Sequence, residues 1–415
     1  TLLETLLMPK NALAANCDFT SRTGFMPFLI FDCAGGAALS ANFLVGKQGG
    51  PTDYLASYDQ MGIPTSPQGG QPIDQQFGLP MLTNISKIRD GLLANTSSTN
   101  VRLASLCVAS TDDSTSNLLS PIGLLAKLGV YGKYIRYGIS NFNTPSGAQS
   151  RGPALHPAMK PMIINDASLL PYYLSYGLIA GGMSEAQRTA MGNALLKLSE
   201  SQQKKLASCG YLKNLDFAKT TEIASEVDPR LNADVRAIYG ITTTQTGAAT
   251  RNPGIVYNVL KGNSGPGVIQ IGSCDYHDGT QTTGDTKDLE IGAEIGKAIE
   301  LARRMNRPLF FAVISDGSVY SDPGTRVWRG DASSKGLAVI GHFNPQATPT
   351  QRRTQVGYYR DAQGVERNTY IGNDPKLAAY VMFLNYLSAC GKVGEFSQHV
   401  PDFDPKRIDE HLVFG

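Results

Sequence analysis

The sequence contains few charged residues and no long hydrophobic run. Charged residues make up 17% of the 415 residues, which is below the usual quarter of a soluble domain, and the net charge is +2. No uninterrupted apolar stretch reaches the roughly 18 residues of a membrane-spanning helix, so we expect no transmembrane segment. Basic residues do not cluster with aromatic residues, which argues against a nucleic-acid partner.

The chain also lacks the short motifs of several large enzyme classes. It has no Walker motif and no G-x-G-x-x-G fingerprint, so nucleotide binding has no support. It has no G-x-S-x-G turn, which counts against the nucleophile elbow of an α/β-hydrolase.

Six cysteines are too few for a disulfide scaffold in a chain of this length. No C-x-x-C spacing occurs among them, so a structural zinc site has little support. Cys33, Cys107 and Cys274 each lie at or near the end of an expected strand, and buried thiols are the simplest interpretation. One or two disulfides are the alternative if the protein is exported.

The domain organisation is expected to be simple. We find no internal repeat and no low-complexity linker, and therefore interpret residues 21–415 as a single domain rich in glycine, proline and long loops. Residues 1–20 are interpreted as an N-terminal arm or the remnant of an export signal. The small-residue pattern from Ala12 to Ala14 is typical of a signal cleavage site, whereas Glu4 within the apolar part favours an arm.

The clearest structural pattern lies between Gly265 and Gly317. An apolar run over residues 268–274 stops at Asp275, hydrophobic residues then recur at helical spacing through residue 304, and a second apolar run over 309–314 ends before Asp316. A strand, a crossover helix and a second buried strand form a parallel βαβ unit. The sequence therefore predicts a mostly parallel sheet.

Further elements extend this unit into a three-layer α/β sandwich with long loops and a C-terminal β-hairpin. The expected strands cover residues 25–31, 101–109 and 336–342, and the hairpin covers 354–370. The expected helices cover residues 83–93, 117–128, 184–206, 218–239 and 375–389, with loops at 138–160 and 242–254.

Five polar residues follow the apolar runs and are the candidate metal ligands. Since binding crevices lie outside the carboxyl ends of the strands in open α/β sheets, we expect these residues to share one edge of the sheet. Carboxylates combined with imidazoles suit a divalent cation such as Zn, Ca, Mg or Mn. An acid that precedes a glycine is alternatively part of a plain turn at the end of a strand, and this alternative applies to Asp316 and to the neighbouring Asp278. The five candidates are Asp32, Asp275, His277, Asp316 and His342.

Asp275 and His277 form the best single element of this set. If the strand continues through them, alternation places residues i and i+2 on the same side, so both side chains would face one cation.

Three stretches of the chain resemble the exported bacterial family called domain of unknown function 1501, within the alkaline phosphatase and sulfatase superfamily. They are the strand that leads into Gly35 and Gly36, the segment over residues 155–162, and residues 274–277 with the helix and strand that follow. The family's Phe-Asp-Thr-His run matches Asp275 and His277 at its polar positions. The resemblance implies an alkaline phosphatase-like fold, and it implies an acid where Asp316 stands.

The chain departs from this family at three places. Ala37 and Ala38 follow the double glycine where the family carries an Asp, and Ser318 and Val319 replace its Gly-Arg. The family's Asp-His-Gly has only an eroded counterpart, which begins at Asp331.

These observations support two functions. The first is an exported metal-dependent hydrolase of small phosphate or sulfate esters, possibly with a degenerate site and without an assigned nucleophile. The second is a non-catalytic protein that keeps the fold and joins other exported subunits in a cell-surface or extracellular assembly. In both cases we expect a periplasmic, cell-surface or extracellular location.

Overall fold

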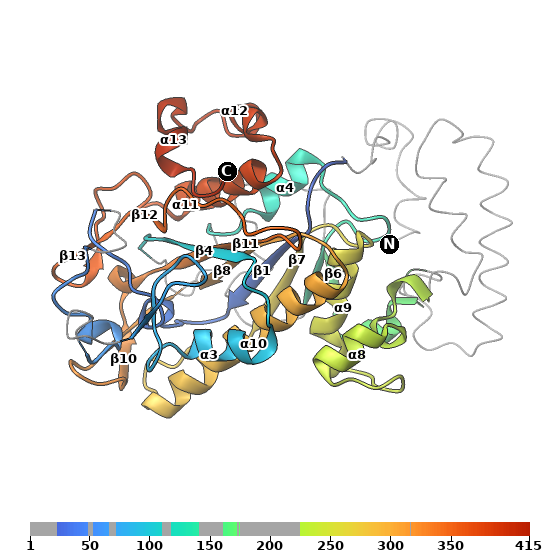
Figure 1. The fold of residues 1–415 in the computed structure, drawn as a ribbon, viewed down its shortest axis with the longest axis horizontal. Coiled ribbons are helices and arrows are strands. Elements are labelled where there is room, and N and C mark those ends of the chain that lie inside the picture. The colour runs from blue at the N-terminus through green and yellow to red at the C-terminus, as the bar shows by residue number, and fades with distance from the viewer. Residues whose placement is uncertain are drawn as a thin grey trace, which may run out of the picture.

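An eight-stranded sheet forms the centre of the molecule (Figure 1). The computed structural model describes residues 23–48, 53–65, 72–109, 118–140, 161–171, 174, 225–315 and 317–415. In spatial order the strands are β12 (Gln355–Val356), β4 (Val101–Leu106), β11 (Ala338–Phe343), β8 (Leu309–Ser315), β1 (Phe28–Cys33), β7 (Gly267–Ile271), β5 (Gly138–Ser140) and β6 (Met162–Ile164).

The sheet is mostly parallel, as predicted. β1 pairs in parallel with both β7 and β8, β5 pairs in parallel with β7 and β6, and β12 pairs in parallel with β4. β11 is antiparallel to both of its neighbours, β4 and β8. The other strands of this sheet therefore end at one common edge, which we call the rim.

Helices cover both faces of the sheet and complete the three layers (Figure 1). One face carries α3 (Lys87–Asn95), α8 (Ala233–Tyr239), α9 (Ala248–Lys261) and α10 (Gln281–Arg304). The other face carries α4 (Ile122–Leu128), α11 (Pro375–Ala389), α12 (Phe396–His399) and α13 (Ile408–His411). Each face has its own cluster of buried apolar side chains. The predicted three-layer sandwich is confirmed.

The predicted βαβ unit is confirmed as β7, α10 and β8. The Thr280 side chain accepts a hydrogen bond from the Thr283 N–H and caps the start of α10, and Arg303 and Arg304 lie in its last turn, where positive charge is favourable. β7 and β8 are not neighbours in the sheet, because β1 lies between them. Three carboxyl ends are thus adjacent at the rim.

Glycines bring α3 and α10 into unusually close contact. A Cβ atom at Gly292 would lie 2.0 Å from the Ile88 carbonyl oxygen, and one at Gly91 would lie 2.2 Å from the Leu289 carbonyl oxygen. The absence of side chains at these positions lets the two backbones touch. This contact fixes α10, and with it the loop that precedes α10, against the body of the domain.

Two expected loops contain regular structure instead. Residues from Ala248 belong to α9 although they were expected to form a loop, because the helix buries Thr250, Pro253 and Gly254 against the rest of the domain. Burial thus outweighs the weak helix propensity of this Thr- and Gly-rich segment. The expected loop over 138–160 begins with β5, which is part of the central sheet.

The C-terminal hairpin is confirmed but is shorter than predicted. β13 (Tyr359–Arg360) pairs antiparallel with β14 (Gly364–Val365), while the beginning of the expected hairpin joins the central sheet as β12. Two further antiparallel pairs are β2 (Ile73–Asp74) with β3 (Met81–Leu82), and β9 (Val319–Ser321) with β10 (Trp328–Asp331). The helix expected over 184–206 and the N-terminal arm lie outside the described residues.

Short 3₁₀ helices connect several elements. They are η1 (Leu39–Ala41), η2 (Asp59–Met61), η4 (Ala167–Leu169), η8 (Pro229–Leu231), η9 (Ser333–Lys335), η10 (Val393–Glu395) and η11 (Pro405–Arg407).

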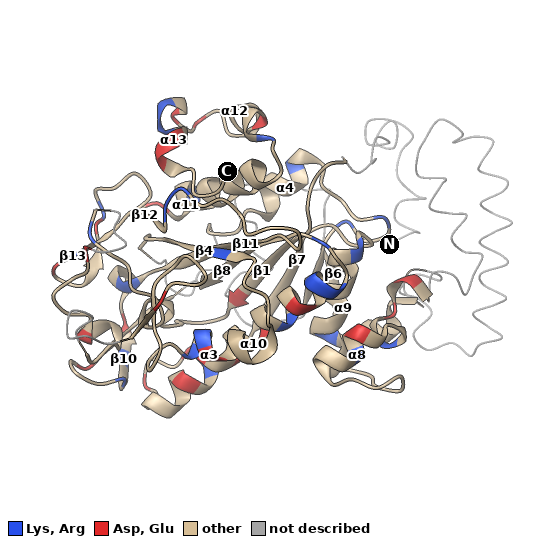
Figure 2. Cartoon of the chain, viewed as in Figure 1, with Lys and Arg blue, Asp and Glu red and all other residues tan. Residues whose placement is uncertain are grey.

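Charged residues of both signs are interspersed on the outer helices, and the central sheet is almost entirely uncharged (Figure 2). Among the described helices, none combines the length and the apolar character needed to cross a membrane.

Candidate metal centre at the rim

The rim brings together the chain segments that follow β1, β7 and β8. The Ala34 N–H donates to the Ile271 carbonyl (3.1 Å), and the Cys274 N–H donates to the Ala34 carbonyl (3.0 Å). These bonds continue the pairing of β1 and β7 beyond the strand ends. They fix the loop over residues 272–279, which connects β7 to α10 and carries Asp275 and His277.

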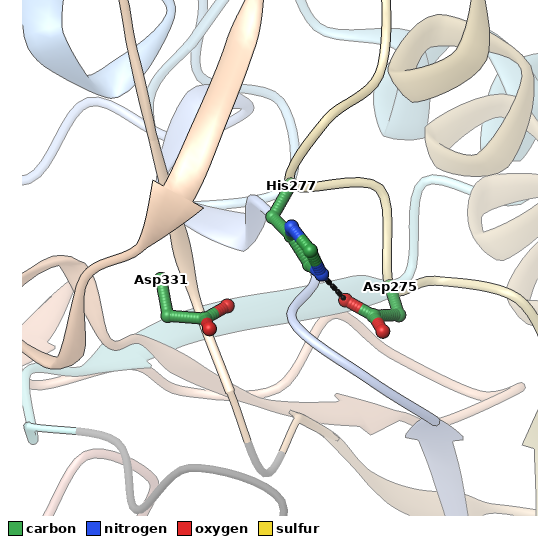
Figure 3. A group of neighbouring side chains, drawn as sticks. All are labelled: Asp275, His277 and Asp331. Atoms are coloured by element: carbon green, nitrogen blue, oxygen red, sulfur yellow. Dashed lines mark ion pairs between the residues drawn. The ribbon is translucent and has the colours of Figure 1, made fainter.

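Asp275, His277 and Asp331 form the candidate metal site, which we call the rim cluster (Figure 3). One ligand atom from each of the three side chains lies within 4.8 Å of the others. His277 Nε2 lies 3.2 Å from Asp275 Oδ1, and both side chains are partly open to solvent. An imidazole and two carboxylates from two separate segments therefore face a common point.

The donor set of the rim cluster fits a divalent cation. Zn²⁺ takes nitrogen and oxygen ligands at about 2.0–2.2 Å in tetrahedral geometry, so two donors on one ion are about 3.4 Å apart. His277 Nε2 and Asp275 Oδ1 already have about this separation, and the three ligand atoms, which lie within 4.8 Å of one another, would draw together around a bound cation. The partial exposure of Asp275 and His277 leaves room for a further ligand on the solvent side.

Tyr276 explains why its two neighbours point outward. Its ring is buried, and its hydroxyl donates to Asp288 Oδ1 (3.0 Å) and accepts from the Ala38 N–H (2.7 Å). With Tyr276 fixed inward, the residues before and after it are directed to the solvent side. Asp275 and His277 thus share one side although they lie in a loop and not on the expected extension of the strand.

The double glycine after β1 makes room for the rim cluster. Gly35 has a φ of +97°, and a Cβ atom there would lie 2.4 Å from Asp275 Cβ. A Cβ atom at Gly36 would lie 3.2 Å from Val319 Cγ1 and 3.6 Å from Asp331 Oδ1. Because the two glycines have no side chains, the segments that carry Asp275 and Asp331 can both pack closely against this turn.

Trp328 anchors the strand that carries Asp331. Its indole is fully buried between Gly62 and Gly284, where added Cβ atoms would lie 2.3 Å and 2.1 Å from the ring. The backbone N–H of Trp328 donates to the Gly279 carbonyl at the end of the 272–279 loop (3.0 Å). β10 is therefore attached directly to the loop that carries the other two members of the cluster.

An irregularity in β10 contributes to the orientation of Asp331. Trp328 pairs with Ser321 and Asp331 pairs with Val319, so β10 has one more residue than β9 between these pairs. Such a bulge changes the alternation of side chains and is common beside functional sites. Beyond it, the Ala332 N–H donates to the Ser318 carbonyl (2.8 Å) and holds the end of β10.

A buried network of charged and polar side chains lies on the interior side of the rim cluster and holds Tyr276 in place. Asp288 is fully buried and accepts from Tyr276, from Asn42 Nδ2 (2.8 Å) and from Arg326 Nη2 (3.4 Å). Burial raises the pKa of Asp288 to about 6, although Arg326, Asn42 and Tyr276 oppose this shift. Arg326 also donates from Nε to Asp285 (2.9 Å), so the network fixes the first turns of α10.

The charges of the rim cluster act on His277. Burial lowers the pKa of His277, but the carboxylates of Asp275, Asp331 and Asp278 outweigh burial, and the net shift is upward. His277 Nδ1 lies 3.4 Å from Asp278 Oδ2, on the side of the ring opposite to Asp275. A carboxylate in this position orients a ligand imidazole by accepting from its second nitrogen.

The five residues predicted from the sequence are only partly brought together. Asp275 and His277 form the rim cluster, whereas Asp316 lies outside the described residues. Asp32 is fully buried in β1, and because it alternates with Cys33 its side chain belongs to the opposite face of the sheet, which α4 and α11 cover. Asp32 thus lies near the rim but is not part of the cluster.

The expected position of His342 is wrong. β11 runs antiparallel to β8, so His342 lies opposite Phe310 at the start of that strand and thus at the end of the sheet away from the rim. It packs against Phe310 and Phe414, and burial lowers its pKa to about 4. An apolar run ending in His342 does not reveal strand direction, and this is why the prediction failed.

Asp331 is the member that the five candidates did not include. The sequence offered a signal, since Asp331 begins the eroded counterpart of the family's Asp-His-Gly. Asp331 does not follow a long buried strand, however, whereas all five candidates follow apolar runs.

Comparisons with known proteins identify only remote similarity. No family model matches the chain, and no curated protein matches its sequence. Among solved structures, the chain is similar to the alkaline phosphatase from the Antarctic bacterium TAB5, with 12% identity, a TM-score of 0.26, and coverage of 89% of this chain and 99% of that chain. A mutant of that enzyme with Mg bound in its M3 site has 12% identity, a TM-score of 0.29 and the same coverage.

TM-scores of this size carry no argument about activity. The α/β class of the protein rests on its own layers and strand order, and the candidate site rests on its own geometry.

Proposed function

We propose that this chain is an exported metal-dependent hydrolase of phosphate or sulfate esters, in which the rim cluster holds a divalent cation. The observation that carries the proposal is the convergence of Asp275, His277 and Asp331 within 4.8 Å at the carboxyl edge of a mostly parallel sheet. This edge is where α/β proteins build their binding sites. Asp316 is a further candidate ligand.

Each residue of the proposed site has a separate role. Asp275 and Asp331 supply negative charge to hold the cation, His277 supplies a nitrogen ligand, and Asp278 orients the imidazole ring. A bound cation would neutralise charge on an ester oxygen and lower the pKa of a water molecule. The nucleophile remains unassigned.

We also propose that the chain is a divergent member of the domain of unknown function 1501 family. The order along the chain of the double glycine, Asp275, His277 and Asp331 supports this assignment. Export is part of the same proposal, and it rests on the resemblance and on the small-residue pattern near the N-terminus.

A non-catalytic protein of an extracellular assembly is the second candidate. The turn after the double glycine favours it, because Ala37 and Ala38 are buried and their N–H groups already donate to Ser315 Oγ (3.1 Å) and the Tyr276 hydroxyl (2.7 Å). This turn therefore presents no acid to a cation. A cation in the rim cluster would then be structural.

Cation titrations and ester assays separate the two candidates. We expect the purified protein to bind one equivalent of Zn²⁺, Mn²⁺, Mg²⁺ or Ca²⁺ in calorimetry, and to hydrolyse p-nitrophenyl phosphate or p-nitrophenyl sulfate. Asp275→Asn and His277→Gln should each weaken cation binding by more than about 10-fold, since loss of a ligand exceeds the usual effect of loss of its supporting residue. Ester hydrolysis should fall in parallel.

Asp409→Asn is the matched control, because this carboxylate is 92% exposed and lies on α13, away from the rim. A protein that binds cations through Asp275 but hydrolyses neither ester would select the non-catalytic candidate. A protein that binds none of the four cations would refute both roles of the rim cluster.

A further inference from the structure

Two cysteines lie next to each other directly behind the rim cluster. Cys33 is the last residue of β1, and Cys274 precedes Asp275 in the 272–279 loop. Both are fully buried and belong to the same apolar cluster. The backbone bonds of Ala34 to Ile271 and Cys274 hold the two segments side by side.

The side chains of the two cysteines are free thiols that lie on the same face of the sheet, in one apolar cluster. The Cys274 thiol raises the pKa of the neighbouring Cys33 thiol, and it donates to the Ile271 carbonyl (3.2 Å). Burial raises the pKa of Cys33 further. Two buried cysteines on segments whose backbones are hydrogen-bonded to each other, with both side chains in one apolar cluster, are placed where a disulfide can form with little backbone movement.

We propose that Cys33 and Cys274 form a structural disulfide that fastens the 272–279 loop to the end of β1 when the protein folds under oxidising conditions. The cross-link would join Cys33, which precedes Ala34 and the double glycine, to Cys274, which precedes Asp275. It would thereby hold together the two segments on which the rim cluster is built.

The reaction needs a low-molecular-weight disulfide such as glutathione disulfide. The Cys274 thiolate attacks one sulfur of that disulfide, forms a mixed disulfide and releases one thiol. The Cys33 thiolate then attacks the Cys274 sulfur, forms the protein disulfide and releases the second thiol. Each cysteine loses one proton, the protein loses two electrons, and the small disulfide gains them.

The other two described cysteines cannot take part in this bond. Cys107 follows β4, which is three strands away from β1, or about 14 Å at the usual strand spacing. Cys390 follows α11 and packs against the apolar cluster on the opposite face of the sheet. Among the described cysteines, only Cys33 and Cys274 are adjacent.

Burial indicates when the bond would form. Fully buried thiols with a raised pKa hardly react in the folded protein, so the bond would form while the 272–279 loop is still open. Once formed, it would be shielded from reductants in the same way. Ser273 precedes Cys274 with a φ of +59°, a conformation that a non-glycine residue adopts only when the surrounding structure holds it.

Peptide mapping tests the proposal directly, since trypsin would place all six cysteines in different peptides. The protein is unfolded and refolded once with glutathione disulfide and reduced glutathione, and once with dithiothreitol. Both samples are then alkylated in denaturant and digested without reduction. We expect peptide 23–47 linked to peptide 262–287 as the main product of the oxidised sample, and both peptides alkylated in the reduced sample.

Thermal unfolding measures the effect of the bond on stability. Since a cross-link that closes a long loop restricts the unfolded chain, the oxidised protein should melt at least about 4 °C above the reduced protein. Cys33→Ala/Cys274→Ala should abolish this difference, and Cys107→Ala should retain it. The reduced protein remains a reference if the double variant fails to fold.

Separately alkylated peptides 23–47 and 262–287 after oxidative refolding would overturn the proposal, as would linkage of either peptide to another cysteine. The result does not depend on cation binding or ester hydrolysis. It therefore stands or falls separately from the proposed function.

Discussion

At the scale of single residues, Gly35 sets the spacing between the end of β1 and the loop that carries Asp275. Two properties of this position exclude a side chain. Its φ of +97° lies in the left-handed region, and a Cβ atom would lie within 2.7 Å of three atoms of Asp275. The second property separates Gly35 from the glycines in turns that share only the first, such as Gly262 and Gly391.

Gly35→Ala should therefore lower the free energy of unfolding by more than the cost of a left-handed backbone conformation alone. The left-handed conformation costs an alanine about 1–2 kcal/mol. Displacement of Asp275 should add about 1–3 kcal/mol, typical of overpacking, and should weaken cation binding at the rim cluster. Urea unfolding and cation titration would measure the two effects.

Gly262→Ala is the matched control for this prediction. Gly262 has a φ of +80°, but no atom lies within 4 Å of its added Cβ. The Gly262→Ala variant should lose only the stability that the left-handed conformation costs an alanine, and it should bind cations as tightly as the wild type. Equal losses of stability in the two variants would contradict the proposed clash with Asp275.

At the scale of elements, the βαβ unit could be predicted from the sequence because long apolar runs and a long amphipathic helix leave few alternatives. The direction of β11 could not, since a buried strand has the same composition in either direction, and His342 was misplaced for this reason. The contribution of Asp331 could not be predicted either. It depends on Trp328 packing between Gly62 and Gly284 and on a bulge, and neither has a local sequence signature.

The contact between α3 and α10 gives a prediction at the same scale. Gly292→Ala should gain about 1 kcal/mol from helix propensity. Its Cβ atom would nevertheless lie 2.0 Å from the Ile88 carbonyl oxygen, which belongs to the backbone of α3 and cannot rotate away. We expect the helices to separate, with a net loss of about 1–3 kcal/mol in the free energy of unfolding.

Gly394→Ala is a suitable control, since no atom lies within 4 Å of its added Cβ. An unfolding free energy for Gly292→Ala equal to or above that of the wild type would contradict the close contact of the two helices.

At the scale of the whole molecule, the rim cluster is exposed, but the charges that support it are buried. Asp288 and Arg326 lie inside one of the two apolar layers, between α10, η1 and the start of β10. A buried pair of this kind contributes little net stability, because removing both charges from water costs about as much as their attraction returns. Its effect is to fix the geometry of the loops around it.

This burial should make the stability of the whole domain depend on pH. The pKa of Asp288 is about 6 in the folded protein, compared with 3.8 for an unperturbed Asp. The folded state thus holds the Asp288 proton more tightly than the unfolded state does. The resulting stabilisation is fully present below about pH 4 and is lost as the pH rises through 6.

The shift corresponds to about 3 kcal/mol, since one pKa unit is equivalent to ~1.4 kcal/mol. Asp288→Asn should remove this contribution, so the difference in unfolding free energy between wild type and variant should change by most of this amount, about 2 kcal/mol, between pH 4 and 6.5 and remain nearly constant at higher pH. Glu300, whose pKa is lowered to about 2 by Arg303 and Arg304, acts in the opposite direction at lower pH but is common to both proteins. Urea unfolding at half-unit pH intervals would measure the difference, and parallel pH profiles for the two proteins would show that Asp288 does not titrate in this window.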